Sequence, residues 1–144
     1  MNALRELRPA EIASRELTHL LRLAVEGDEA SLAALLCEEL PRLSVHGVVD
    51  DGRVLGFVAF DAGTDPVTIE YIAVDESARE RRLGAALVGA AARFGRAVYA
   101  QTDDDAVGFY RRLGFAIVPC DPDPRWPERQ RYDFLLDAGD RAGT

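Results

Sequence analysis

The chain has 144 residues, of which 48% are hydrophobic, so it can bury one core and is not a disordered segment. Its formal net charge of −8 opposes nonspecific binding to nucleic acid or to an anionic membrane, and we expect neither as a partner. The sequence has neither a long uncharged apolar run nor a signal-peptide core, so it predicts a cytoplasmic protein whose two cysteines, Cys37 and Cys120, are free thiols that bind no metal.

The first half of the chain is predicted to form a short strand, two helices and a three-stranded meander. Apolar residues recur at helical spacing after Pro9, which suits a first helical turn, and Asp28 is placed to cap the second helix. Asp51 and Gly52 are a hairpin signal between two β-prone runs. The predicted elements are a strand over 4–8, helices over 9–24 and 28–40, the second ended by Pro41, and strands over 43–49, 53–60 and 67–74.

The second half alternates helices with short strands. We predict a helix over 84–94, a short buried strand over 97–100, a helix over 104–113 and strands over 115–118 and 131–136. The prolines in 120–127 predict an irregular segment there, and the polar tail over 138–144 is expected to be flexible. The order predicts one α+β domain over 1–144, with a mixed, mostly antiparallel sheet of six to seven strands flanked by about four helices.

Two segments carry the functional signal. The strand ending at Val74 is followed by a polar loop and then by an arginine- and glycine-containing run, 79–86, that opens a helix. Unpaired N–H groups and the partial positive charge of a helix N-terminus bind phosphates, so this run is a candidate pyrophosphate cradle. The second segment, 103–115, is predicted to form a helix that carries Tyr110 and ends in a Leu-Gly-Phe stop.

Together these segments closely resemble acetyl-CoA-dependent N-acetyltransferases of the GNAT superfamily, and the element order resembles the GNAT fold over nearly the whole chain. The resemblance implies direct transfer of the acetyl group of acetyl-CoA to a primary amine of a small molecule or peptide. It also implies that the acceptor is chosen by 10–40 and 121–131, but the sequence does not identify that acceptor. Homodimers are common among similar enzymes, and the sequence leaves the oligomeric state open.

The resemblance also assigns residues to the cofactor. The family pattern is Arg or Gln, two variable residues, Gly, one variable residue, then Gly or Ala. Loop length favours the register in which Arg79 opens it and Arg82 stands at the first glycine, although a register starting at Arg81 fits fully. A helical φ at Arg82 with an outward side chain would avoid crowding the pyrophosphate. The implied cofactor-binding residues are Ile72, Ala73 and Val74 through their backbone, the loop residues Arg79, Arg81, Arg82, Leu83, Gly84 and Ala85, and Asp103 and Phe109 at the second helix.

Acetyl transfer to an amine needs a base for the amine, a donor for the carbonyl oxygen and a proton for the departing thiolate. By the resemblance, Tyr110 supplies that proton and the Val74 N–H holds the oxygen, while packing alone also explains Tyr110. Glu70 is the candidate base, because strand alternation would place it on the same face as Ile72 and Val74. The alternative bases are His46 and Asp75, and a water ordered by Glu70 could mediate the transfer. Asp103 stands where the family often has asparagine and is also expected to cap its helix.

Two other functions fit the same fold. One is a non-catalytic module that binds an acyl-CoA, which the departures at Arg82 and Asp103 keep open. The other is an interaction domain without a cofactor. A toxin that acetylates aminoacyl-tRNA would need a concentrated basic face, which the net charge of −8 argues against.

Overall fold

The computed structural model describes residues 3–25, 28–93, 97–103, 107–112, 114–120, 124 and 131–136. Its strands form one seven-stranded sheet in the order β1-β2-β3-β4-β5-β7-β6. The β4–β5 pair is parallel and the other neighbouring pairs are antiparallel, which confirms the predicted mixed sheet. The strands are β1 (Ala3–Glu6), β2 (Ser44–Asp50), β3 (Arg53–Asp61), β4 (Val67–Val74), β5 (Val98–Asp103), β6 (Ala116–Cys120) and β7 (Arg131–Leu136).

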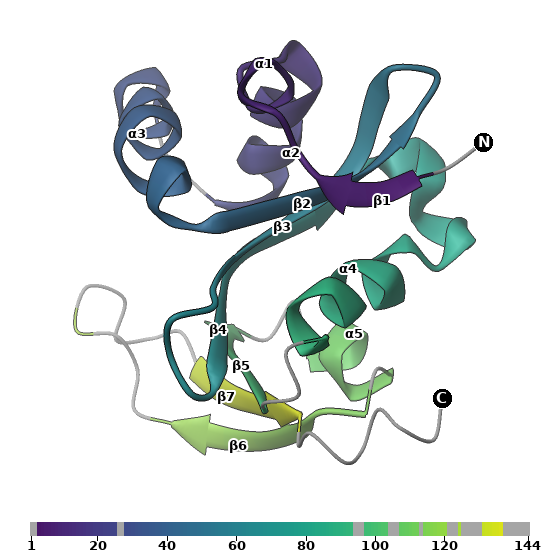
Figure 1. The fold of residues 1–144 in the computed structure, drawn as a ribbon. Coiled ribbons are helices and arrows are strands. Elements are labelled where there is room, and N and C mark those ends of the chain that lie inside the picture. The colour runs from purple at the N-terminus through teal and green to yellow at the C-terminus, as the bar shows by residue number, and fades with distance from the viewer. Residues whose placement is uncertain are drawn as a thin grey trace.

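The described ranges hold five α-helices and three short turns of other helical types. The helices α1, α2 and α3 lie on one side of β1–β4, and α4 and α5 lie on the other side of the sheet (Figure 1). The α-helices are α1 (Pro9–Ile12), α2 (Arg15–Ala24), α3 (Glu29–Ala34), α4 (Leu83–Ala92) and α5 (Val107–Arg112); the turns are a π-turn η1 (Leu35–Glu39) and 3-10 turns η2 (Leu40–Arg42) and η3 (Glu76–Arg81).

Local chemistry explains where the elements depart from the prediction. The single helix expected over 9–24 is two helices, because the Ser14 hydroxyl accepts from the Leu17 N–H and caps a new start. The regular helix expected over 28–40 and ended by Pro41 instead ends at Ala34, because the chain continues as the π-turn η1 and then as η2, with Pro41 near the start of η2. The hairpin is confirmed: Asp51 and Gly52 have φ of 50° and 77°, as a type I′ turn requires.

The ends of two strands in the second half also differ. β5 runs to Asp103, three residues beyond the predicted strand, because its backbone stays paired with β7 through Arg131. Pro119 and Cys120 belong to β6, and an edge strand tolerates a proline because one side of its backbone has no partner strand. The described part of the second predicted helix is α5, and the ends predicted for it at 104–106 and 113 lie outside the described residues, as do the tail over 138–144 and most of 121–130.

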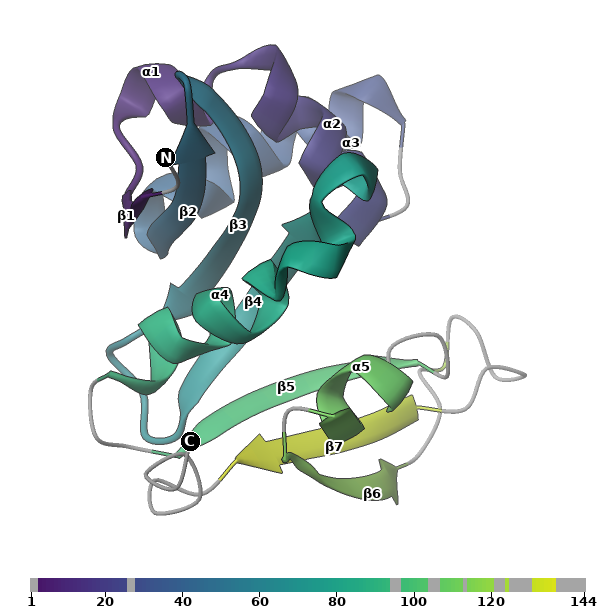
Figure 2. The same cartoon turned by 90° about the vertical axis from the view of Figure 1, so that its right-hand side faces the viewer.

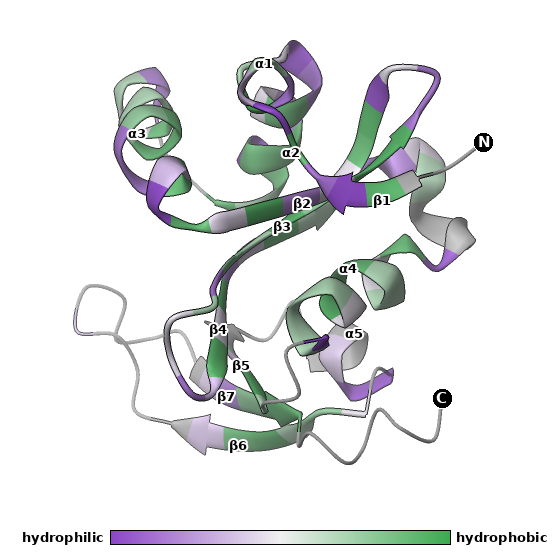
Figure 3. Ribbon diagram, in the orientation of Figure 1, coloured by the Kyte–Doolittle hydropathy of each residue, from purple (hydrophilic) through white to green (hydrophobic). Residues whose placement is uncertain are grey.

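The sheet separates two apolar cores. One lies between the sheet and α4 and α5, and contains Phe60, Leu87 and Phe134. The other lies between the sheet and α1–α3, and contains Leu17, Leu21 and Phe57. The central strands are accordingly apolar, while the tip of the β2–β3 hairpin is hydrophilic (Figure 3). None of the helices in the described ranges combines the length and apolar character that a membrane span needs.

The feature that positions the functional site is the divergence of β4 from β5. The described pairing joins only Val67 with Val98 and Thr68 with Tyr99. The two strands start side by side and then separate, as Figure 2 shows. The backbone of β4 from Ile69 to Val74 therefore faces this opening on its β5 side and pairs with β3 on the other side.

Candidate active site

The wedge-shaped opening between β4 and β5 leads to the loop that the sequence marks as a phosphate cradle. After Val74 the chain forms η3, turns at Arg82 and enters α4. Arg82 has φ 58° and ψ 29°, in the left-handed region, and its side chain is exposed. The expectation of an ordinary helical φ is therefore wrong, because the chain reverses sharply between η3 and α4. Glycine adopts this conformation most readily, which agrees with the register that places Arg82 at the family's first glycine.

The first turn of α4 presents the backbone groups that a phosphate would meet. Leu83 and Gly84 are buried, and Ala85 is exposed. The first N–H groups of a helix lack partners within that helix and carry its partial positive charge. Arg79 and Arg81 lie in η3, directly before this turn, and their side chains are outside the described set. The backbone of this segment has the form of an anion-binding turn.

Glu70 lies on a β-bulge that its sequence did not reveal. In the β3–β4 pair, Ala59 is opposite Tyr71 and Phe60 is opposite Ile69, which leaves Glu70 as an extra residue. The bulge shifts the alternation: Ile72 and Val74 pack in the core beneath α4, whereas Tyr71 and Ala73 pack in the opposite core. The prediction that Glu70 shares a face with Ile72 and Val74 is therefore wrong.

Glu70 instead lies near charged groups on the side of α2 and α3. The side chain is exposed, yet surrounding protein atoms remove enough water to raise the pKa of its carboxyl group. The negative charges of Glu39 and Asp61 raise that pKa further. An exposed carboxylate with a raised pKa is a better proton acceptor than an ordinary glutamate.

Two residues beside Glu70 were not singled out from the sequence. The Tyr71 hydroxyl donates a hydrogen bond to Oε2 of Glu39, a residue 32 positions earlier in the π-turn η1. Burial and this carboxylate raise the pKa of Tyr71, so the phenol keeps its proton and remains a donor. Neither a β-bulge nor a π-turn has a simple residue signature, so the pattern of residues alone could not bring Glu39 to Glu70.

Tyr110, the candidate acid, is 4% exposed and packs among aromatic rings. Its ring stacks on Phe134 with centroids 4.6 Å apart and meets the edge of Phe115 at 5.0 Å. Burial raises the pKa of Tyr110 to about 12, so its hydroxyl is protonated at neutral pH. The aromatic contacts are therefore sufficient to explain why Tyr110 is buried. The same burial keeps the hydroxyl protonated, as a general acid requires.

The alternative bases are placed less favourably than Glu70. His46 is 7% exposed, its ring is 5.4 Å from that of Phe60, and burial lowers its pKa. Asp75 caps η3: its carboxylate accepts from the Ser77 N–H at 3.0 Å and from the Ser77 hydroxyl, and these bonds lower its pKa. A carboxylate with a lowered pKa holds a proton weakly and is a poorer base.

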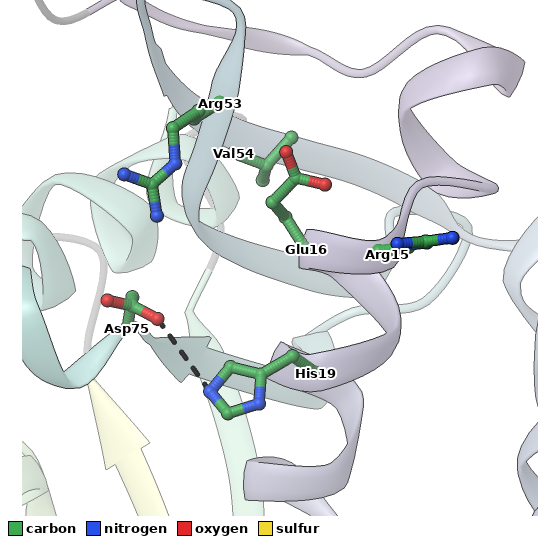
Figure 4. Close-up of a pocket in the computed structure, with 6 residues that line it drawn as sticks. All are labelled: Arg15, Glu16, His19, Arg53, Val54 and Asp75. Carbon is green, nitrogen blue, oxygen red and sulfur yellow. Dashed lines mark ion pairs between the residues drawn. The ribbon is translucent and has the colours of Figure 1, made fainter.

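A pocket of ≈ 400 Å³ lies beside Asp75, the residue that follows the last residue of β4 (Figure 4). It is lined by Arg15, Glu16 and His19 of α2, by Arg53 and Val54 of the hairpin, and by Asp75. His19 Nε2 is 3.7 Å from Asp75 Oδ1, so the pocket adds a second neighbour to this carboxylate. Neither Glu70 nor Tyr110 lines this pocket.

Asp103 and Phe109 are located only by their backbone. Asp103 ends β5, opposite Arg131, and its predicted role as the cap of the next helix stays a prediction because residues 104–106 lie outside the described part of the chain. Phe109 lies in α5, next to Tyr110 in the chain. The side chains of both residues are outside the described set, so their roles toward a cofactor stay predictions.

The fold and this opening define an acyltransferase-like domain, and comparison with known proteins agrees. The model of the acetyltransferase (GNAT) family matches residues 7–115, about three quarters of the chain, and the chain belongs to this family. No curated protein sequence gives a significant match.

Three solved structures illustrate the similarity. A putative GNAT-family acetyltransferase from Desulfovibrio desulfuricans has 15% identity and a TM-score of 0.74, over 96% of this chain and 100% of that one. An aminoglycoside 6'-N-acetyltransferase complexed with coenzyme A has 19% identity and a TM-score of 0.74, covering 94% and 97%. NAA60 of Arabidopsis thaliana in complex with acetyl-CoA has 16% identity and a TM-score of 0.67, covering 95% and 99%. These likenesses establish the GNAT fold, and such relatives bind coenzyme A or acetyl-CoA.

Proposed function

We propose that this protein is an N-acetyltransferase that transfers the acetyl group of acetyl-CoA directly to a primary amine of a small molecule or peptide. The observation that carries the proposal is the opening between β4 and β5, which ends at the left-handed turn before α4. An extended ligand arm can pair with the free edge of a strand, and its phosphates suit a helix N-terminus. Family membership supports the same reaction class.

The residues present suit the cofactor. The backbone of Ile72, Ala73 and Val74 would bind the pantetheine arm along the open edge of β4. The pyrophosphate would be held by the N–H groups of Leu83, Gly84 and Ala85, with Arg79, Arg81 and Arg82 adding positive charge. The positive φ of Arg82 lets the chain turn as a glycine would, so the cradle forms despite the missing glycine. Asp103 and Phe109 would complete the site from the β5 side.

The chemistry is then divided between the two sides of the opening. Acetyl-CoA supplies the acetyl group as a thioester. Glu70 takes a proton from the acceptor's ammonium group, directly or through a water, so that the nitrogen can bond to the acetyl carbon as the carbon–sulfur bond breaks. The Val74 N–H stabilises the negative charge on the carbonyl oxygen, and Tyr110 donates a proton to the departing sulfur. The nitrogen loses its second proton as the amide forms, and a proton taken up through solvent restores Tyr110. Glu70 lies on the side of α2 and α3, the elements that the family resemblance assigns to the acceptor.

Calorimetric titration with acetyl-CoA tests the cofactor site. We expect one-to-one binding that is lost in an Arg79→Ala, Arg81→Ala, Arg82→Ala triple variant. The matched control replaces Arg8, Arg22 and Arg42, three exposed arginines elsewhere, with the same change in net charge. Binding by the parent and control but not by the triple variant supports the site. No binding at millimolar acetyl-CoA would favour an interaction domain without a cofactor.

A thiol-release assay over a panel of primary amines tests the transfer itself. We expect Glu70→Gln to lower kcat/KM by roughly 10²-fold, the lower end of the usual general-base contribution. The control Asp51→Asn removes the same charge from an exposed position at the tip of the β2–β3 hairpin, outside the segments assigned to the acceptor, and should keep parental activity. Cofactor binding without turnover for any amine would instead identify a non-catalytic acyl-CoA-binding module.

A further inference from the structure

Two irregular segments, far apart in the chain, meet beside the candidate base. The π-turn η1 (Leu35–Glu39) interrupts the helical segment after α3, with the Leu40 N–H bonded to the Leu35 carbonyl. The β-bulge in β4 contains Glu70 as its extra residue. An extra residue in a helix rotates the side chains that follow by roughly 100°, and a bulge redirects the side chains of its strand. Both irregularities recur at functional sites in proteins.

One hydrogen bond joins these segments. The Tyr71 hydroxyl, next to the bulge, donates to Oε2 of Glu39 at the end of η1. Tyr71 is half-buried and retains its proton, so it acts only as the donor to a carboxylate. Such charge-assisted hydrogen bonds are stronger than those between neutral groups. The bond fixes an exposed glutamate that would otherwise sample several rotamers.

We propose that Glu39 is a positioning residue for Glu70, held by Tyr71 so that its negative charge makes Glu70 a stronger base. This inference rests on the proposed transferase function, with Glu70 as the proton acceptor. Among the described residues, the charged and titratable groups that act on Glu70 are Glu39 of η1, Asp61 of β3 and Tyr71 of β4 itself. Of the two carboxylates, Glu39 raises the pKa of Glu70 more than Asp61 does. No cation of the described residues is among the main groups that shift this pKa. Like charges disfavour ionisation, so each of them makes Glu70 retain a proton more readily.

The direct test is an NMR titration of the Glu70 side-chain carboxyl carbon, assigned by its loss in Glu70→Gln. We expect Glu39→Gln to lower the pKa of Glu70 by roughly half a unit, the effect of one like charge at a solvent-accessible distance. Glutamine keeps an oxygen for the Tyr71 hydroxyl, so the local contact survives while the charge is removed. Glu38→Gln is the matched control, because Glu38 is the preceding exposed residue and is not among the main groups that shift the pKa of Glu70. Identical titration of Glu70 in the parent and Glu39→Gln would overturn the proposal.

The hydrogen bond is tested by repeating the comparison without it. In a Tyr71→Phe background Glu39 keeps its charge but is no longer fixed, so Glu39→Gln should shift the pKa of Glu70 clearly less than in the parent. An undiminished shift would show that Tyr71 does not hold Glu39 in place and would overturn that part of the proposal.

The pH profile of kcat/KM connects this coupling to catalysis. We expect its acidic limb to move to lower pH in Glu39→Gln by the same amount as the NMR titration of Glu70. A purely structural role for Glu39 would change the rate at every pH without moving the limb. A moved NMR titration with an unmoved limb would show that Glu70 is not the base, which separates failure of the proposed mechanism from failure of the Glu39–Glu70 coupling.

Discussion

Gly56 of β3 lies directly opposite Val74, the last residue of β4. A Cβ on Gly56 would be 3.2 Å from the Ala73 carbonyl oxygen and 3.5 Å from the Val74 Cα, and also 3.2 Å from Leu87 Cδ1 of α4. The glycine therefore lets α4 and the end of β4 pack closely. These are the two elements that frame the proposed cofactor site, so a side chain at position 56 would press against both of them.

Gly56→Ala is expected to weaken binding of acetyl-CoA by displacing the Ala73–Val74 backbone by a few tenths of an ångström. We expect roughly a tenfold loss of affinity in calorimetry, about 1.4 kcal/mol. Gly89→Ala is the matched control, since a Cβ there meets nothing within 4 Å. That change in the middle of α4 should stabilise the fold by up to about 1 kcal/mol and leave affinity unchanged. Equal affinities for the parent and Gly56→Ala would show that the end of β4 does not contact the cofactor.

Arg82→Gly separates the backbone of the cradle from its charge. Arginine is strained at φ 58°, and glycine relieves this but gains entropy in the unfolded chain, so we expect stability to change by less than about 1 kcal/mol. Affinity for acetyl-CoA should fall several-fold at low salt, because one cation is lost while the turn is kept. Asp51→Gly is the control, with the same backbone change at φ 50° in the β2–β3 hairpin. Parental affinity for Arg82→Gly would show that the Arg82 guanidinium does not contribute to phosphate binding.

Tyr110→Phe tests whether the buried phenol does more than pack. The ring contacts with Phe115 and Phe134 remain, so we expect acetyl-CoA affinity to stay nearly unchanged. Turnover should fall by roughly 10²-fold if the hydroxyl supplies the proton for the departing sulfur. Tyr99→Phe is the control: it removes a hydroxyl that hydrogen-bonds Asp133 on β7, at 2.7 Å, and should keep the parental rate. Equal rates for Tyr110→Phe and the parent at saturating substrates would remove Tyr110 from the mechanism.

Most of the fold was predictable because its signals are local. Asp51 and Gly52 set the hairpin through their positive φ angles, and the alternating apolar strands could pair only with one face toward each core. The break at Ser14 was missed, since a serine inside an apolar helical pattern equally fits a continuous helix. Pro119 was placed outside a strand because the sequence does not show that β6 is at the sheet edge.

The site was less predictable because it depends on breaks in periodicity. Strand alternation assumes an unbroken pairing, and the bulge at Glu70 moved this residue away from Ile72 and Val74. The left-handed φ of Arg82 follows from the way the chain passes from η3 into α4. Arginine rarely adopts a positive φ, so the sequence does not predict this conformation. Contact between Tyr71 and Glu39 depends on two such irregularities at once, so it was reachable only from the structure.

Acid sensitivity of the fold is the last expectation, and it comes from His46. Its ring is buried and Nδ1 has no hydrogen-bond partner in the described part of the chain. Burial lowers the pKa of His46, with the nearby Arg93 acting in the same direction and Glu6 opposing it. The unfolded chain, with an imidazole pKa of about 6.5, therefore binds the proton more readily than the folded protein does. Above about pH 6.5 His46 is neutral in both states, and the fold keeps the full stability that neutral His46 provides. As the pH falls from there through the lower pKa of the folded protein, this contribution to stability is lost.

We therefore expect the free energy of unfolding, measured with urea, to decrease as the pH is lowered below about 6.5. His46→Leu should flatten this dependence, because it removes the group that takes up the proton on unfolding. The same slope in His46→Leu as in the parent would show that the carboxylates, and not His46, determine the response to acid in this range.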